Sequence, residues 1–163
     1  MIETSDEKII EITSPVLLEF AMTVYICQSF ESSLCFLLSL MEGNLPPKKQ
    51  NNFQNSWDFH SKKTLGTLLK FLQSKIDLPQ DVNNFLSERI KLRNQVVHGY
   101  LIKNGLRFAN SVGRHEMIIE LTEMRHQIKK GNIVINEMLD VYLEKYGTSS
   151  KQLKENVSHL FDS

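Results

Sequence analysis

The chain is poor in the residues that mark several common kinds of functional site. Its two cysteines, Cys27 and Cys35, are eight residues apart on a predicted helix, about 12 Å along the axis, which is too far for a disulfide between them. We expect both to be reduced core residues. The five histidines are scattered, and no C-x-x-C or H-E-x-x-H spacing occurs, so the sequence predicts no metal site. It contains no glycine-rich phosphate loop, and no cofactor is expected.

The chain also lacks net charge. Nineteen basic and nineteen acidic side chains give a formal net charge of zero. A nonspecific nucleic-acid binder of high affinity carries a marked basic surplus, so the molecule as a whole does not belong to that class. Any contact with RNA is expected to be local and transient.

A targeting signal is the next feature that the sequence does not show. Residues 1–8 are acidic and polar, without a basic region that leads into a hydrophobic segment, and we expect a cytoplasmic protein. The apolar stretch over residues 16–41 is interrupted by Glu19, Gln28 and Glu31. We therefore expect a buried helix there and no membrane span.

Hydrophobic periodicity predicts helices along most of the chain and an all-α fold. The first helix is expected to begin near Ser14 and Pro15, a cap residue followed by a proline suited to the first turn, and to run to about Met41. Its apolar side chains cover more than one face. This distribution is typical of a central helix or of a helix in a subunit interface.

The rest of the chain adds three or four further helices. They are expected from about residue 61 to 76, from Pro79 to His98 and from about 114 to 145, with a possible kink near Gly131 and a loop or short ribbon over residues 101–113. Ser149 and Gln152 resemble the capping box of a short terminal helix. The sequence thus predicts an antiparallel bundle of about four to five helices, a domain over residues 1–147 with 148–163 as its C-terminal tail.

Residues 43–57 are predicted to form a long solvated loop, because they contain a Pro-Pro pair and several Asn and Gln residues. Loops of this length are often functional. Lys48, Lys49 and Trp57 are candidate RNA contacts that would supply charge and a stacking surface. The alternative is a connector whose Trp57 packs back on the core.

The octapeptide RNQVVHGY, residues 93–100, places a fixed cation where a buried hydrocarbon is expected. At about 100° per residue, Arg93 falls near the middle of the arc that the apolar side chains of the helix define. A guanidinium does not lose its charge there, so it needs an internal partner or a cleft shared with another chain or a polyanion. Asn94 and His98 lie together on one polar flank, and Gly99 is suited to the left-handed turn that ends a helix.

Glu31 interrupts the apolar seam of the first helix as Arg93 interrupts the later one. One interpretation is a structural ion pair between these two residues, or a glutamate at the edge of the seam. The other is that Glu31 orients Arg93 or His98 from the neighbouring helix. Both interpretations predict that Glu31 lies close to the motif.

These residues resemble the R-x(4-6)-H-x-Y signature of HEPN domains, which are small helical proteins with the motif at the end of a central helix. Arg93, Asn94, His98 and Tyr100 match it. The resemblance implies a HEPN-like bundle and a metal-independent endoribonuclease of a toxin or phage-defence type, active as a homodimer with a composite site. It also makes Tyr100 a candidate adenylylation acceptor for a nucleotidyltransferase-type antitoxin. A packed, hydrogen-bonded Tyr100 that closes the loop is the structural alternative.

The residue types of the motif suit metal-free RNA cleavage. His98 is a candidate general base or acid, Arg93 is a candidate bidentate phosphate ligand, and Asn94 is a candidate phosphate donor or imidazole anchor. Arg93 and His98 are about 140° apart on an ideal helix, so one phosphate meets both more readily where two copies of the helix face each other. A noncatalytic helical module that binds a nucleotide or a protein partner is the alternative function.

Overall fold

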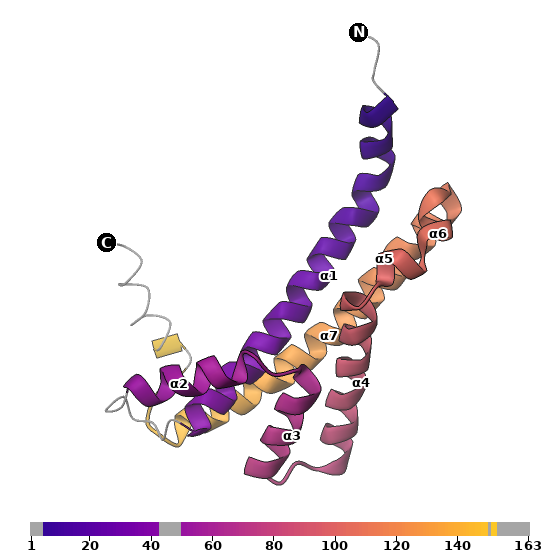
Figure 1. Cartoon of the computed structure of the whole chain (residues 1–163). Helices are drawn as coiled ribbons and strands as arrows, with labels where there is room; N and C mark the ends of the chain where they lie inside the picture. Colours follow the sequence, from indigo (N-terminus) through magenta and orange to yellow (C-terminus); the bar gives the residue numbers. More distant parts are fainter. Residues whose placement is uncertain (1–4, 43–49, 150, 153–163) are drawn as a thin grey trace. The chain divides into compact units, whose positions relative to one another are not determined.

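The fold is known from a computed structural model, which describes residues 5–42, 50–149 and 151–152 (Figure 1). Within these ranges the regular structure is helical and no strand occurs, which confirms the all-α prediction. Seven helices are present there: α1 Ser5–Glu42, α2 Gln50–His60, α3 Leu65–Lys75, α4 Gln80–Val97, α5 Tyr100–Lys103, α6 Gly105–Ala109 and α7 Ser111–Glu144.

The chain divides into two compact units of similar length. Unit 1 comprises Met1–Phe30 and Gln80–Gly131, and unit 2 comprises Glu31–Pro79 and Asn132–Ser163. The two long helices, α1 and α7, each contribute one part to either unit. The motif RNQVVHGY, residues 93–100, lies entirely in unit 1.

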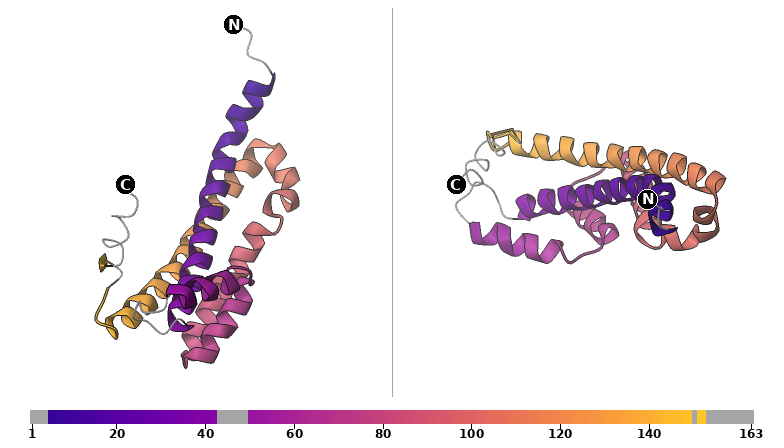
Figure 2. Two further views of the ribbon diagram at one scale, coloured as in Figure 1. Left: turned by 60° about the vertical axis from the view of Figure 1, so that its left-hand side comes forward. Right: turned by 90° about the horizontal axis from the view of Figure 1, so that it is seen from above.

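Unit 1 is built from the first part of α1, from α4 to α6, and from the first part of α7. Its α1 and α7 segments lie side by side (Figure 2): Arg125 Nε donates to Glu19 Oε1 at 2.7 Å, and the Thr23 hydroxyl lies 3.3 Å from the carbonyl oxygen of Leu121. The buried apolar side chains of unit 1 are Val16, Cys27, Phe30, Leu86, Ile90, Val96, Tyr100, Met117, Leu121, Met124 and Ile128.

Gly131 allows a close approach inside unit 1, and the kink expected near it stays a prediction. A Cβ at this position would lie 3.2 Å from Arg89 Cβ and 3.2 Å from Phe30 Cζ. The glycine therefore makes room for the side chains of α4 and α1, and α7 passes through it as one uninterrupted helix.

Unit 2 has a leucine-rich core supplied by the later part of α1, by α3 and by the end of α7. In α3, Leu65, Leu68, Leu69 and Leu72 form the predicted apolar stripe and are buried. The Tyr142 hydroxyl donates to the carbonyl oxygen of Leu40 at 3.2 Å, which ties the α7 segment to the α1 segment.

Three boundary predictions were wrong. The first helix begins at Ser5 and contains Pro15 in its interior, because the missing N–H of Pro15 costs only one helical hydrogen bond at an exposed position. Residues 50–57 of the predicted loop belong to α2, where Phe53 and Trp57 stack one turn apart and packing outweighs the weak helix propensity of Asn. The expected loop or ribbon after the motif contains α5 and α6.

Two smaller predictions are confirmed. Cys27 and Cys35 are buried free thiols, and burial, with the nearby charge of Glu31, raises the pKa of Cys35 to about 11. The capping box also forms: the Ser149 N–H donates to Gln152 Oε1 at 3.1 Å, and the Gln152 N–H donates to Ser149 Oγ at 3.2 Å.

The long apolar helix meets the requirements for a bilayer span by length and composition. The qualifying part is Lys8–Glu42, with a mean hydropathy of 1.6 and 11% of the window buried. Glu19, Gln28 and Glu31 therefore do not exclude a span, contrary to our reasoning from the sequence. The core helix of a soluble protein meets the same requirements, and α1 buries Val16, Cys27 and Phe30 within unit 1, so a core helix stays our prediction.

Candidate functional site

The motif closes α4 in the manner that its sequence predicts. Leu86, Ile90 and Val96 are buried on the inner side of the helix. Gly99 has a φ of 96° and a ψ of 25°, the left-handed conformation that glycine adopts without strain. The turn at residues 98–99 ends α4 and leads into α5. His98 is exposed and directly follows Val97, the last residue of α4.

Asn94 bonds the Arg93 side chain with its own side chain, and its carbonyl accepts the helical backbone hydrogen bond of His98. Arg93 Nη1 donates to Asn94 Oδ1 at 3.1 Å, and the backbone N–H of His98 donates to the carbonyl oxygen of Asn94 at 3.0 Å. Arg93 is half-buried, while Asn94 and His98 are exposed. The Asn94 side chain therefore holds one end of the Arg93 guanidinium at the edge of the exposed side of α4, on which His98 also lies.

Arg93 and His98 leave the helix in different directions, about 140° apart. Arg93 lies on the packed side of α4, between the positions of Ile90 and Val96, and His98 lies on the solvent side. A phosphate that reaches both groups needs a second surface opposite α4. This geometry is the reason that a composite site stays part of the hypothesis.

Tyr100 is held inside unit 1 by a small polar network. Its side chain is 3% exposed and its ring stacks on Phe20, with centroids 6.3 Å apart. The phenol donates to Glu120 Oε2 at 2.8 Å, and Arg107 Nη1 donates to the same oxygen at 2.7 Å. Burial, followed by the hydrogen bond to Glu120 and its charge, raises the pKa of Tyr100.

The geometry of Tyr100 is that of the structural alternative, a packed aromatic that closes the turn. Asn104 reinforces it, since its side-chain N–H₂ donates to the carbonyl oxygen of Tyr100 at 2.9 Å. In this conformation the hydroxyl points at a carboxylate instead of at solvent. A role as adenylylation acceptor therefore requires that the network opens first.

The other sequence-predicted site residues lie outside the motif's unit. Glu31 and Trp57 belong to unit 2, so the contact of Glu31 with the motif and the RNA contact of Trp57 stay predictions. Trp57 is half-buried and stacks on Phe53, with ring centroids 6.4 Å apart, as in the alternative in which it packs back. Lys48 and Lys49 lie outside the described residues.

Unit 2 contains a buried polar cluster that the sequence reasoning missed. His60 is fully buried, and its Nε2 donates to Glu42 Oε2 at 2.8 Å. The same oxygen accepts from Ser56 Oγ at 2.8 Å, and Lys75 Nζ lies 3.6 Å from Glu42 Oε1. Partial burial raises the pKa of Glu42, but these hydrogen bonds and cations outweigh it and lower the pKa below its usual value. The cluster anchors α2 on α1 and α3.

The sequence reasoning also missed a long stretch without acidic residues around the motif. Residues 89–115 contain no Asp or Glu, although the whole chain has as many acidic as basic side chains. The cations of this acid-free segment are Arg89, Lys91, Arg93, Lys103, Arg107 and Arg114, and its histidines are His98 and His115. This uneven distribution of acidic residues can be read from the sequence, but the zero net charge of the whole chain gives no indication of it.

Among the described residues, no group of three or more His, Cys, Asp and Glu side chains is placed to hold a metal ion. Comparison with known proteins gives no further assignment: no family model, no curated protein and no solved structure matches the chain. The candidate site thus rests on the geometry of unit 1, namely Arg93, Asn94 and His98 at the end of α4.

Proposed function

We propose that the protein is a metal-independent endoribonuclease of the HEPN type, a cytoplasmic toxin or phage-defence effector that acts as a homodimer. The observation that carries the proposal is the grouping at the end of α4: a half-buried Arg93 guanidinium bonded to the Asn94 side chain, and an exposed His98 one helical turn after Asn94. Both lie in a stretch without acidic side chains, which suits a phosphate ligand.

The proposed chemistry assigns one task to each side chain. His98 takes the proton of the ribose 2′-hydroxyl or supplies one to the leaving 5′-oxygen, the tasks of an imidazole in general acid–base catalysis. Arg93 binds the nonbridging phosphate oxygens as negative charge builds on them. Asn94 fixes the guanidinium. The attack of the 2′-oxygen on phosphorus breaks the bond to the 5′-oxygen and leaves a 2′,3′-cyclic phosphate.

The wild-type protein should cleave RNA in EDTA and leave 2′,3′-cyclic ends, whereas His98→Ala should abolish cleavage. The matched control is His126→Ala, an exposed histidine of α7 in the same unit, which should remain active. The measurement is cleavage of an end-labelled RNA, with circular dichroism to check folding. Loss of wild-type activity on chelation, restored by a divalent ion, would show that the chemistry is wrong.

Mixing two inactive variants tests the composite site. If the Arg93 of one copy works with the His98 of the other, a heterodimer of Arg93→Ala and His98→Ala contains one intact pair, and cleavage returns when the two are refolded together. If both groups act within one chain, the mixture stays inactive. The second result would keep the nuclease but remove the shared site.

A noncatalytic helical module that binds a protein partner is the second candidate. The observation that favours it is the exposure of Ile102 and Leu106, at 87% and 90%, directly after the motif. Apolar side chains this exposed are typical of a protein contact. An unchanged partner affinity in His98→Ala, together with no cleavage by the wild type, would favour this module.

A further inference from the structure

The acid-free segment, residues 89–115, is the strongest local departure from the average composition of this chain. An even spread of the acidic residues would place about three of them in a stretch of this length. The segment covers the second half of α4, all of α5 and α6, and the start of α7, so it belongs to one compact unit and to one continuous run of helices.

Two of its arginines have structural roles. Arg89 Nη1 donates to Glu88 Oε2 at 2.8 Å and its Nη2 donates to Gln127 Oε1 at 2.9 Å. Arg107 is ion-paired with Glu120 at 2.7 Å. These cations are neutralised by acidic neighbours just outside the segment, so they add little to its surface potential.

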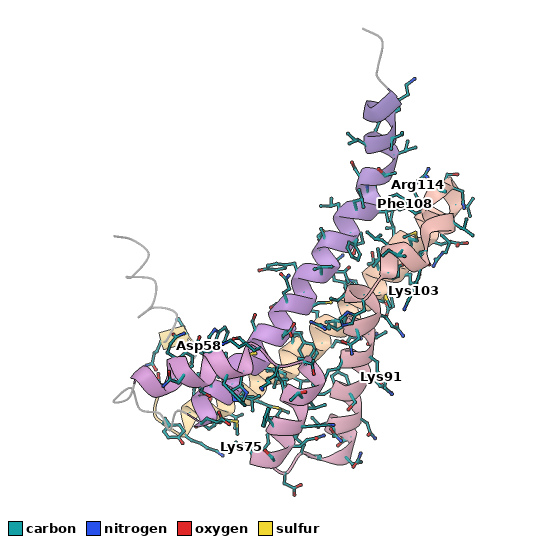
Figure 3. The ribbon with its side chains drawn as sticks, in the orientation of Figure 1. Asp58, Lys75, Lys91, Lys103, Phe108 and Arg114 are labelled. Atoms are coloured by element: carbon teal, nitrogen blue, oxygen red, sulfur yellow. The ribbon has the colours of Figure 1, made fainter. Side chains whose placement is uncertain are left out.

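Lys91 and Lys103 differ from these arginines. Both are exposed, and within the described residues the structure shows no hydrogen bond or ion pair for the side chain of either lysine. In Figure 3 their side chains extend from the same edge of the ribbon, Lys91 from α4 and Lys103 from α5. Between them along the chain lies His98, also exposed.

Helix geometry places Lys91 and His98 on one face. Seven residues make almost two full turns, so the two side chains point within about 20° of each other and their Cα atoms are about 10 Å apart along the axis. The exposed neighbours on this face are Asn94 and Gln95, whose amides donate to phosphate or base acceptors. The face thus begins with the cation of Lys91 and continues with hydrogen-bonding side chains as far as His98.

We infer that the exposed face formed by Lys91, His98 and Lys103 binds the phosphate backbone of single-stranded RNA and leads the strand across the motif. The inference adds an RNA-binding face to the proposed nuclease. It rests on that proposal only for the cleavage of the bound RNA. Lys91 and Lys103 are positioning residues on either side of His98. An RNA strand fits better than an anionic membrane, because a helix that lies in a bilayer surface has apolar side chains among its cations, and the α4 part of this face has amides there.

The test measures RNA binding in the His98→Ala background, where the strand is not cleaved. A fluorescein-labelled single-stranded RNA of mixed sequence is titrated at several NaCl concentrations and followed by anisotropy. The test variant adds Lys91→Ala and Lys103→Ala. The matched control adds Lys129→Ala and Lys130→Ala, two exposed lysines of α7 in the same unit, so both variants lose the same charge.

Removing two phosphate contacts should lower the slope of log Kd against log salt by about 1.4, which corresponds to roughly 25-fold weaker binding at 0.1 M salt if the affinities converge at 1 M. The control should bind as the parent does. If both double variants weaken binding equally, the effect is one of net charge and the face is not the RNA path. If neither changes the affinity, the inference is equally overturned.

Two further arms separate this inference from its alternatives. Vesicles with and without phosphatidylserine replace the RNA: binding that depends on Lys91 and Lys103 with vesicles only would overturn the RNA assignment in favour of a membrane. The wild type is assayed for cleavage in parallel. Absence of cleavage with intact, lysine-dependent RNA binding would reject the nuclease and leave the RNA-binding face in place.

Discussion

Unit 1 and unit 2 are similar in length but differ in how they cover their apolar side chains. Among the described residues, sixteen large hydrophobic side chains are exposed, and twelve of them belong to unit 1. Unit 2 instead buries a leucine-rich core and His60, which is bonded to the half-buried Glu42. The unit with the candidate site is therefore the one that exposes more large apolar side chains, and such exposure is typical of a surface that contacts another molecule.

The exposed side of α1 shows the difference most clearly. Leu18, Met22 and Tyr25 lie opposite the buried side of the helix, and Glu19 is the only charged residue between Ile12 and Phe30. Glu19 is itself ion-paired with Arg125 inside unit 1. The outer side of this segment is thus free of charge, a composition suited to a subunit interface.

The largest expected effect comes from breaking this surface. If the proposed dimer forms through this side of α1, Leu18→Lys places a charge in the interface and should give a monomer at micromolar concentration, as measured by light scattering. The matched control in unit 2 is Val141→Lys, since Leu18 and Val141 are 63% and 58% exposed, and it should remain a dimer. A wild-type protein that is already a monodisperse monomer would remove the dimer and the composite site together.

Two glycines, one in each unit, allow the packing of the two units to be compared. Gly113 is buried at the start of α7, where the backbone of Arg107 occupies the place of a Cβ. Gly113→Ala should therefore displace α6 and lower the free energy of unfolding by about 1–3 kcal/mol. Gly66 in α3 is exposed, with nothing within 4 Å of a Cβ, and Gly66→Ala should raise stability by about 0.5–1 kcal/mol.

Urea unfolding measures both glycine variants. Because α6 carries Arg107, the Gly113 variant should also weaken the Tyr100–Glu120 network, which near-ultraviolet circular dichroism reports through the environment of Tyr100. If the two substitutions changed the free energy of unfolding equally, the corner between α6 and α7 would be loosely packed.

Local sequence signals predicted the parts of this protein that depend on local physics. The apolar arc of α4, the left-handed Gly99 and the Ser149–Gln152 box each follow from residues within one or two helical turns. The helical class followed from periodicity in the same way. The boundaries of α1 and α2 did not, because Pro15 is tolerated where the helix is exposed and the Asn-rich start of α2 is compensated by aromatic packing.

The parts of the site that sequence reasoning missed are contacts between distant residues. The partner of Tyr100 is Glu120, and the cation that completes the network is Arg107, and no spacing in the sequence links these three. The acid-free segment was visible without a structure. The sequence does not tell which cations of this segment are available at the surface. The structure shows that Lys91 and Lys103 are exposed, whereas Arg89 and Arg107 are ion-paired.

The smallest expected effect concerns Tyr100, and it tests whether the motif's tyrosine is structural or regulatory. Tyr100→Phe keeps the ring stacked on Phe20 but removes the hydrogen bond to Glu120. The carboxylate keeps its ion pair with Arg107, so the variant should lose only about 1 kcal/mol of stability. The matched substitution in unit 2 is Tyr142→Phe, which removes a bond to the carbonyl oxygen of Leu40.

If a nucleotidyltransferase modifies Tyr100, the network must open before transfer, and the added phosphate then lies beside the site where the RNA phosphate binds. We expect Tyr100→Phe to remain a nuclease and to escape neutralisation by a coexpressed transferase. We expect Glu120→Gln, which weakens the hold on the phenol, to be modified faster than the wild type. The measurement is mass spectrometry of the coexpressed proteins. A wild-type protein without a nucleotide adduct, or a Tyr100→Phe variant that is neutralised as readily, would leave Tyr100 with its structural role alone, because the buried bond to Glu120 already accounts for the residue.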